Sequence, residues 1–374
     1  MSSGNIARFF KVYIMPAAVL QSVMVGGGYG TGREVVEFVT SAGPRGGVAA
    51  IALIFFIWSV LIALSFELAR MMKAYNYRHF IKGLIGPAWV IYEVLAIATL
   101  TIVLAVVLSA SSQLIFDALK VPKIVSSVGV IIAVAWVMHY GEKLVESLLS
   151  VWAGLVSGFL ILVFLIVFFR TGSKIWTPLA TVDTMGDWAR KGGTFSLYNV
   201  ALIPVLLYSL TEIKTRSEAF ISGVIAAGAG ILPAVMMHLM FMSTYPDILS
   251  EPLPMYSIIS GIGSPVLMTS YFVILLGTIL LTAIGALEGV AERVDGWMRD
   301  KRGVSFGPRG RLILGGATLL VSALLSMVGV IGLVAKGYGS MAWGFLAIYV
   351  LPVLTIGAWR VFTNNPGNVQ DDSS

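Results

Sequence analysis

Long apolar runs dominate the chain, and short stretches rich in charged residues, glycine or proline separate them. A helix needs about 20 apolar residues to cross the hydrocarbon core of a bilayer. Roughly ten runs have this length, so the pattern predicts an all-α polytopic membrane protein with about ten transmembrane helices. We expect these segments, numbered 1 to 10 below, at about residues 11–40, 47–72, 84–117, 122–139, 143–170, 194–213, 216–243, 265–294, 311–333 and 340–361.

The composition supports a membrane protein. Of the 374 residues, 57% are apolar and only 12% are charged, and the mean hydropathy is +0.91. Soluble globular domains have about 45–50% apolar and about 25% charged residues. These values exclude a soluble enzyme, a disordered chain and a nucleic-acid-binding protein. Cysteine is absent and the three histidines lie far apart in sequence, so we expect no disulfide, no Cys-ligated metal and no cofactor.

The basic residues indicate how the chain crosses the membrane. With a cytoplasmic N-terminus, sixteen Lys and Arg residues fall on the cytoplasmic side and eight on the outer side. Such an excess marks the cytoplasmic side. We therefore expect an even number of segments, with both termini inside, in the cell (plasma or inner) membrane. The polar tail, residues 363–374, is expected to be disordered.

Segment 1 contains five glycines among the seven residues from Gly26 to Gly32. Each glycine inside a helix costs about 0.8–1 kcal/mol relative to alanine, so five together favour a break. Within a membrane, freed backbone is tolerated where it lines a cavity or packs against protein. There it presents carbonyls to cations, and the restarting helix presents N–H groups to anions. The alternative is an intact helix whose glycines permit a close helix crossing.

Segment 6 contains a proline near its middle. Pro204 removes one backbone hydrogen bond and clashes one turn back, which predicts a kink or break near residues 199–204. Tyr198 and Asn199 directly precede this point, and a buried Asn is costly unless it forms hydrogen bonds. The alternative is a simple kink in which Asn199 bonds to the freed carbonyl.

The two interruptions lie five segments apart. Interrupted segments at corresponding positions of two halves are the best sequence indication of a transporter binding site made from inverted repeats. We therefore expect a first repeat in residues 1–170, an extracellular connector in 171–193 and a second repeat in 194–362.

The stretch Gly26-Gly-Gly-Tyr-Gly-Thr-Gly-Arg-Glu34 has a known counterpart. It resembles the Gly-Ala-Gly-Phe-Ala-Ser-Gly-Gln-Glu motif in the first span of the YkvI-like amino-acid permease family. That family is part of the amino acid–polyamine–organocation superfamily, whose members have the LeuT fold. The sequence departs from the motif at Arg33, where the family has Gln, so a cation is expected beside the site.

The resemblance implies five-plus-five inverted repeats, with broken helices 1 and 6 and the substrate held midway between segments 1, 3, 6 and 8. It also implies alternating access driven by an ion gradient. Carried over by position, the first break supplies backbone contacts to the substrate and the second break lines the other side. These positions are Gly28, Gly30, Thr31 and Gly32 in segment 1, and Tyr198, Asn199 and Ala201 in segment 6.

The same resemblance suggests Na⁺ as a coupling ion, because sodium symporters of this fold bind it between segments 1 and 8. Thr278 and Thr282 are spaced i, i+4 and so share one helix face. With the carbonyls of Gly26 and Tyr29 they form a predicted sodium site. The alternative is that each hydroxyl bonds back to its own helix. Proton-coupled relatives have a Lys in segment 5, whereas Lys143 lies only at the end of that segment here.

Arg33 and Glu34 form an ionisable pair inside a predicted span, and such pairs usually mark function. Glu34 is a candidate proton carrier. Alternatively it binds a substrate ammonium while Arg33 binds a carboxylate. A third possibility is a purely structural ion pair involving Glu37. Thr101, near the middle of segment 3, is a further candidate for substrate contact.

Together these features predict a secondary active transporter and not an enzyme. The expected activity is Na⁺- or H⁺-coupled symport of a small zwitterionic solute, such as an amino acid or related amine, by alternating access. The expected partners are that small-molecule substrate and the lipid bilayer. Two alternatives remain at this stage, a passive channel and a sensor that keeps the transporter fold.

Overall fold

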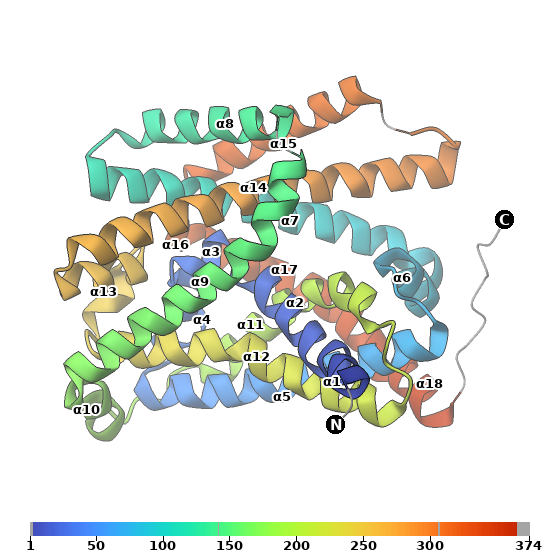
Figure 1. Cartoon of the computed structure of the whole chain (residues 1–374), viewed down its shortest axis with the longest axis horizontal. Helices are drawn as coiled ribbons and strands as arrows, with labels where there is room; N and C mark the ends of the chain where they lie inside the picture. The colour runs from blue at the N-terminus through green and yellow to red at the C-terminus, as the bar shows by residue number, and fades with distance from the viewer. Residues whose placement is uncertain (1–2, 141, 306, 365–374) are drawn as a thin grey trace.

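The computed structural model describes residues 3–140, 142–305 and 307–364, and in these ranges every regular element is a helix (Figure 1). Segments 1 to 5 form the first half of the chain. Their elements are α1 (Ser3–Phe9), η1 (Phe10–Ile14), α2 (Met15–Met24), α3 (Gly27–Gly30), α4 (Arg33–Phe38), η2 (Thr40–Ala42), α5 (Pro44–Met72), α6 (Tyr77–Ile85), η3 (Gly86–Ala88), α7 (Trp89–Leu119), α8 (Lys123–Tyr140) and α9 (Glu142–Thr171).

Segments 6 to 10 form the second half, after the connecting helix α10. The elements of this half are α10 (Ser173–Thr181), α11 (Trp188–Asn199), η4 (Val200–Leu210), α12 (Arg216–Met242), η5 (Asp247–Ser250), α13 (Pro254–Ile262), α14 (Pro265–Arg302), α15 (Pro308–Ser326), α16 (Val330–Gly332), η6 (Leu333–Tyr338), α17 (Gly339–Phe345), η7 (Leu346–Val350), η8 (Val353–Gly357) and α18 (Ala358–Thr363).

The ten-segment layout is confirmed. Nine helical stretches of the described chain are long and apolar enough to cross a membrane, and a shorter apolar helix, Lys123–Trp136, holds the fourth position. Several boundaries differ from the prediction; segment 8 runs on to Arg302, and segment 9 ends at Ser326 rather than near residue 333. The connector between segments 5 and 6 contains α10, segment 6 begins earlier, at Trp188, and segment 10 begins at Val330 rather than near residue 340. Residues 365–374 of the predicted tail lie outside the described residues.

Segments 1 and 6 are interrupted as predicted, but by different means. In segment 1 the α-helix stops at Met24, and a single turn, α3, separates it from α4. In segment 6 the α-helix gives way after Asn199 to the 3₁₀-helix η4, which contains Pro204. Proline cannot donate the i→i−4 hydrogen bond, so the sequence favours a change of helix type at this point.

Contacts between helices repeat with a period of five segments. Segment 2 packs on segment 7 (α5 on α12), and segment 3 packs on segment 8 (α7 on α14). The contact of segment 1 with segment 7 (α2 on α12) has its counterpart in segment 6 with segment 2 (α11 on α5). The pair α7–α15 is matched by α14–α8. This symmetry is what two structurally related halves produce.

Small residues allow the central helices to approach closely. A side-chain carbon at Gly223 of α12 would lie only 2.6 Å from the Ala63 backbone of α5. Membrane helices associate through such contacts because lipid supplies no hydrophobic driving force between them. Large apolar side chains such as Ile124, Phe169 and Leu312 are exposed on the outside of the bundle, as a lipid-facing surface requires.

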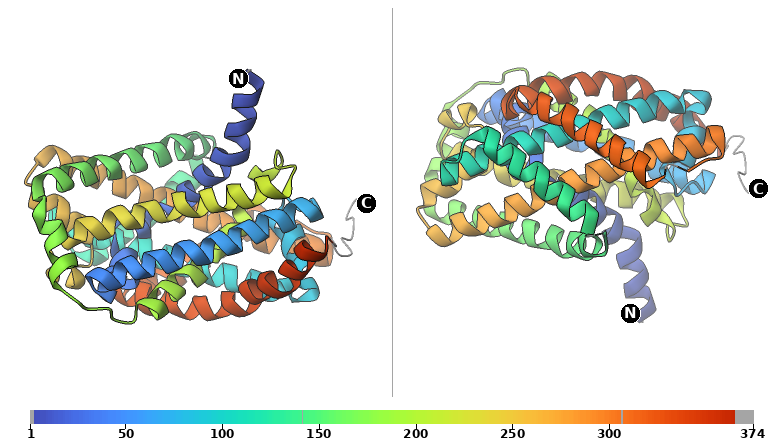
Figure 2. Two further views of the ribbon diagram at one scale, coloured as in Figure 1. Left: turned by 90° about the horizontal axis from the view of Figure 1, so that it is seen from below. Right: turned by 90° about the horizontal axis from the view of Figure 1, so that it is seen from above.

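The two short helices α6 and α13 lie at opposite ends of the bundle (Figure 1). They occupy equivalent places in the two halves, α6 between segments 2 and 3 and α13 between segments 7 and 8. The first helix, α1, projects away from the bundle (Figure 2). It is tied to the start of α12 by an ion pair between Arg8 and Glu218 at 2.6 Å.

Candidate functional site

A hydrogen bond between Glu34 and Tyr198 joins the two interrupted segments. The Tyr198 hydroxyl donates to Glu34 Oε2 at 2.5 Å, and both residues are buried, with 5% and 6% of their surface exposed. Gly32 adopts the left-handed conformation (φ 79°) and turns the chain directly before α4 begins. This turn places Glu34 in the first turn of α4, which packs against α11.

Aromatic side chains surround this pair. Tyr338 of η6 stacks on Tyr198 with ring centroids 4.8 Å apart, and two phenylalanines of α4 and α11 lie 5.5 Å from the Tyr198 ring. Tyr29 and Tyr338 both interact electrostatically with Glu34, and the buried Tyr29 hydroxyl has no hydrogen-bond partner among the residues that the structure describes. The Glu34 carboxyl group is therefore surrounded by phenols from three elements, α3, α11 and η6.

Arg33 is committed to other partners. Its guanidinium is buried and forms an ion pair with Glu37 at 2.7 Å. It also donates to the carbonyls of Leu249 at 2.8 Å and Glu251 at 3.2 Å. The ion pair with Glu37, one of the alternatives that the sequence left open, is present. Arg33 thus fastens α4 to the connector between segments 7 and 8.

The first interruption also contacts α13 and α14. Gly28 and Gly30 lie in α3, and the Gly30 carbonyl accepts a hydrogen bond from the Tyr271 hydroxyl at 3.4 Å. The buried Thr31 accepts, on its carbonyl, a hydrogen bond from the backbone N–H of Met255 at 3.0 Å. These bonds hold the unwound part of segment 1 in one arrangement.

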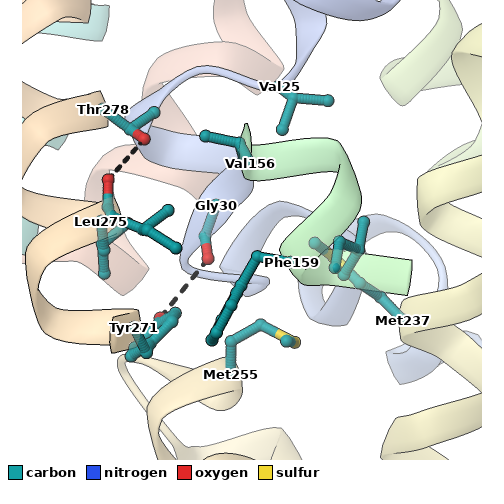
Figure 3. Close-up of a pocket in the computed structure, with 11 residues that line it drawn as sticks. Val25, Gly30, Val156, Phe159, Met237, Met255, Tyr271, Leu275 and Thr278 are labelled. Carbon is teal, nitrogen blue, oxygen red and sulfur yellow. Dashed lines mark hydrogen bonds between the residues drawn. The ribbon is translucent and has the colours of Figure 1, made fainter. Parts of the chain in front are cut away.

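A small cavity lies beside Gly30, between the first interruption and segments 5, 7 and 8 (Figure 3). Its volume of about 30 Å³ holds a water molecule or two but no amino acid. The lining is apolar apart from Tyr271 and Thr278, whose hydroxyls bond within the surrounding helices. The site is closed around the first interruption in this conformation.

The oxygens predicted to bind sodium already form hydrogen bonds. Thr278 and Thr282 both donate to carbonyls of their own helix at 2.7 Å, the alternative that the sequence left open. Thr278 Oγ1 also accepts a hydrogen bond from Trp152 Nε1 at 3.0 Å. The carbonyls of Gly26 and Tyr29 accept backbone hydrogen bonds. A side-chain carbon at Gly26 would lie 3.3 Å from Thr282 Oγ1, so these two positions are adjacent. The sodium site stays a prediction.

The remaining predicted substrate contacts do not meet at Glu34. Asn199 donates to the Phe195 carbonyl one turn back at 2.9 Å, and its side chain also interacts with Tyr198, the partner of Glu34. Ala201 is half-buried against the core at the start of η4. Thr101 donates to its own helix, and its carbonyl accepts a hydrogen bond from Ser322 of α15 at 2.9 Å.

Three residues of the site were not predicted as such from the sequence: the Tyr338 ring, the Tyr29 phenol and Trp152. Tyr29 was proposed only for its carbonyl. Nothing in the local pattern marks Tyr338, because it meets Tyr198 only through the packing of segment 10 against segment 6. The sequence contains one signal for Trp152, since a buried tryptophan usually needs a hydrogen-bond partner for its N–H.

The α6 end of the bundle carries a separate ionic cluster. Glu93 forms an ion pair with Arg293 at 2.8 Å, and Asp300 pairs with Lys82 at 2.9 Å and with Arg78 at 3.6 Å. A polar cavity of about 280 Å³ lies beside this cluster, between α6 and the end of α14. These pairs connect α6 and α7 to α14, while at the other end of the bundle Arg33 connects α4 to the connector before α13.

Comparison with known proteins supports this architecture. No protein-family model matches the chain. It is 22% identical over 309 residues to the uncharacterized membrane protein YkvI of Bacillus subtilis (strain 168), covering 80% of this chain and 84% of that protein. The resemblance drawn from the glycine-rich motif is confirmed.

Two solved structures share the fold. A mutant of the Eremococcus coleocola manganese transporter matches with a TM-score of 0.59 and 12% identity, covering 98% of this chain and 87% of that one. The inward-facing conformation of Mhp1 matches with a TM-score of 0.50 and 14% identity, covering 90% and 76%. These neighbours are membrane transporters and not enzymes. The chain is therefore a multi-pass membrane protein with the LeuT fold, similar in sequence to YkvI.

Proposed function

We propose that the chain is a secondary active transporter for a small amine-bearing solute, such as an amino acid or related amine. It couples solute movement to a gradient of sodium or protons by alternating access. The observation that carries this proposal is the buried Glu34–Tyr198 pair, which bridges the two interrupted segments. Solutes bind at such interruptions because unwound backbone and a few side chains supply polar contacts inside an apolar bundle.

Glu34 supplies the chemistry for an amine. Its carboxylate pairs with an ammonium group, and the phenol rings around it favour a cation over an anion. A solute that also carries a carboxylate finds backbone N–H groups in the first interruption. Arg33 is already bonded to Glu37 and to two carbonyls, so it is not the carboxylate partner in this conformation.

Contacts at both ends of the bundle support the proposal of alternating access. With the termini cytoplasmic, the α13 end faces outward, and Arg33 and the Thr31–Met255 bond keep it closed in this structure. The ion pairs of Arg78, Lys82 and Arg293 then lie at the cytoplasmic end. A transport cycle breaks one set while the other holds. A passive channel would need both ends open at once.

Manganese is not the proposed substrate, although one structural neighbour is a manganese transporter. Within the described part of the chain, no group of three His, Cys, Asp or Glu side chains gathers to hold a metal ion. Glu34 has aromatic neighbours instead of further metal ligands.

A thermal-shift screen tests the proposal. Purified protein is scanned with amino acids, amines and betaines, each in sodium and in choline buffer at two pH values. A ligand that binds only the native state raises the melting temperature. At a ligand concentration of 100 times its Kd, the free energy of unfolding rises by roughly 2.7 kcal/mol. We expect a shift for amine-bearing solutes and none for their uncharged analogues. No shift with any solute would remove the amine assignment.

A further inference from the structure

We infer that Glu34 holds either a proton or the ammonium group of the substrate, and never both, so that the protein exchanges an amine for a proton. This inference rests on the proposed function and specifies its coupling. It makes the proton the counter-ion at the substrate site itself. The movement of proton and amine in opposite directions distinguishes it from symport.

Glu34 has no cationic side chain paired with it in the described ranges. Glu34 is 6% exposed, and within the described part of the chain its carboxyl group accepts a hydrogen bond from one side chain, the neutral phenol of Tyr198. None of the ion pairs in the described ranges includes Glu34. A charged carboxylate in an apolar interior is costly unless a cation accompanies it. Without substrate, a proton is the available cation; with substrate, an ammonium group replaces it.

The other charged groups around α4 have partners other than Glu34. On α4 itself, Arg33 pairs with Glu37. The titratable groups on the elements packed against α4 are neutral phenols, are bonded to other partners or are exposed. They are Tyr29 of α3, Tyr198 of α11, Tyr338 of η6, His238 of α12 (bonded to Thr40 and the Pro44 carbonyl), Arg216 of α12 (over the Phe220 ring), Glu218 of α12 (paired with Arg8), Arg190 of α11 (paired with Asp187), Lys191 of α11 (bonded to Ser41), the exposed Lys336 of η6, the exposed Asp247 of η5, and Glu251 after η5, whose carbonyl binds Arg33.

Sodium is the alternative coupling ion, and one oxygen of its predicted site already accepts a hydrogen bond from a neighbouring helix. Thr278, one of the predicted sodium ligands, accepts a hydrogen bond from Trp152 Nε1, with the nitrogen 3.0 Å from the Thr278 oxygen. A cation at this oxygen would face that N–H dipole. The Trp152 ring also covers Gly277, where a side-chain carbon would lie 2.1 Å from the indole. The Trp152 indole therefore fills the space between segments 5 and 8 at this point. Because the Thr278 oxygen is occupied in this way, we assign the coupling role to Glu34.

The exchange step balances in charge. When the substrate ammonium reaches Glu34, the carboxyl O–H bond breaks and the proton leaves to water on the open side. The carboxylate then pairs with the ammonium, and Tyr198 continues to donate its hydrogen bond. On the other side water returns a proton to Glu34 as the amine leaves. The site gains and loses one positive charge at each step, so exchange of a monovalent amine is electroneutral.

Proton release on binding measures this directly. Purified full-length protein in weakly buffered detergent solution receives ethylamine, choline or alanine, and a pH-sensitive dye records protons released. Parallel melting curves record which probes bind. We expect about one proton released per bound ammonium. Glu34→Gln should lower the release at least tenfold, and Glu34→Asp should retain it. Glu212→Gln, a change at a half-exposed carboxylate near the end of segment 6, is the matched control and should behave as the unchanged protein.

The outcomes separate the inference from the proposed function. Binding of a probe without proton release would overturn the exchange and leave an amine transporter. Sodium-dependent binding would do the same, in favour of the Thr278 site. Unchanged release from a folded Glu34→Gln protein would move the exchange to another group and overturn the assignment. If no probe binds, the proposed function itself fails.

Discussion

The contrast between Arg33 and Glu34 shows how much one residue position decides. These neighbours form an obvious ionisable pair in the sequence, yet they serve different ends. Arg33 bonds to Glu37 and to the connector before α13, while Glu34 meets Tyr198 of segment 6. Adjacent residues of a helix point about 100° apart, so one turn of α4 presents a fastening residue and a site residue.

Gly32 is the residue that makes this geometry possible. It has φ 79°, and an added side-chain carbon would lie 2.6 Å from the Phe241 ring. We predict that Gly32→Ala destabilises the protein by roughly 1–3 kcal/mol, from backbone strain plus overpacking. The melting temperature in detergent measures the effect. Gly129→Ala, at an exposed helical glycine with open space around it, is the control. Equal melting temperatures for the two variants would contradict the role of the turn.

At the scale of elements, the sequence predicts the interruptions well and their partners poorly. Five glycines and Pro204 are local signals, because each acts on the backbone around it. The contacts of Tyr338 and Trp152 depend on how distant segments pack, which no local pattern encodes. Thr101 shows the same dependence on packing, since its carbonyl accepts a hydrogen bond from Ser322 of α15, a contact that its position in mid-span does not announce.

The 3₁₀ form of η4 is attributed to Pro204, and this is testable. Pro204→Ala restores a backbone donor, so η4 should shift toward α-helix and rotate the residues that follow. We expect solute uptake to fall several-fold while the melting temperature is kept or raised. Pro233→Ala, inside the continuous helix α12, is the control and should retain uptake. Normal uptake in Pro204→Ala would show that the 3₁₀ segment is dispensable.

Arg33 is expected to hold α4 against the connector to α13. Its hydrogen bonds to the carbonyls of Leu249 and Glu251 involve a charged donor, for which roughly 1.5–3 kcal/mol each is typical. Since about 1.4 kcal/mol corresponds to tenfold in an equilibrium, Arg33→Gln should raise opening at this end at least tenfold. The chain has no cysteine, so maleimide labelling of Met255→Cys, a buried site, reports opening without background.

The control for this opening experiment is Arg45→Gln. Arg45 is exposed and bonds to Asp183 and to the α10 region, so its loss leaves α4 in place. Labelling of Met255→Cys should stay low in that background. Equal labelling in the Arg33 and Arg45 variants would mean that α4 is held by other contacts.

At the scale of the whole molecule, the fold was predictable because its main determinants are long apolar runs and two local interruptions. The boundaries of the segments were harder to predict from the sequence. The polar connector after segment 5 contains the helix α10. This helix buries Ile175 against the bundle, and the composition of the connector does not predict that contact. The repeat of contacts every five segments is visible only in three dimensions, since the two halves have little sequence in common.

Both termini are predicted to lie in the cytoplasm, which places the α13 end outside. In intact cells, a membrane-impermeant maleimide should label Ser250→Cys beside α13 and leave Asn76→Cys beside α6 unlabelled. Permeabilised cells should show labelling of both. The opposite pattern in intact cells would invert the topology and the direction assigned to each gate.

Uptake into proteoliposomes tests the central claim most directly, that Glu34 couples amine transport to a cation gradient. The solute with the largest thermal shift is supplied outside, and the vesicle interior is made acidic, alkaline or sodium-free in turn. We predict accumulation above equilibrium with an acidic interior, little dependence on sodium, and at least a tenfold loss in Glu34→Gln. Equilibration without accumulation under every gradient, or full accumulation in Glu34→Gln, would contradict it.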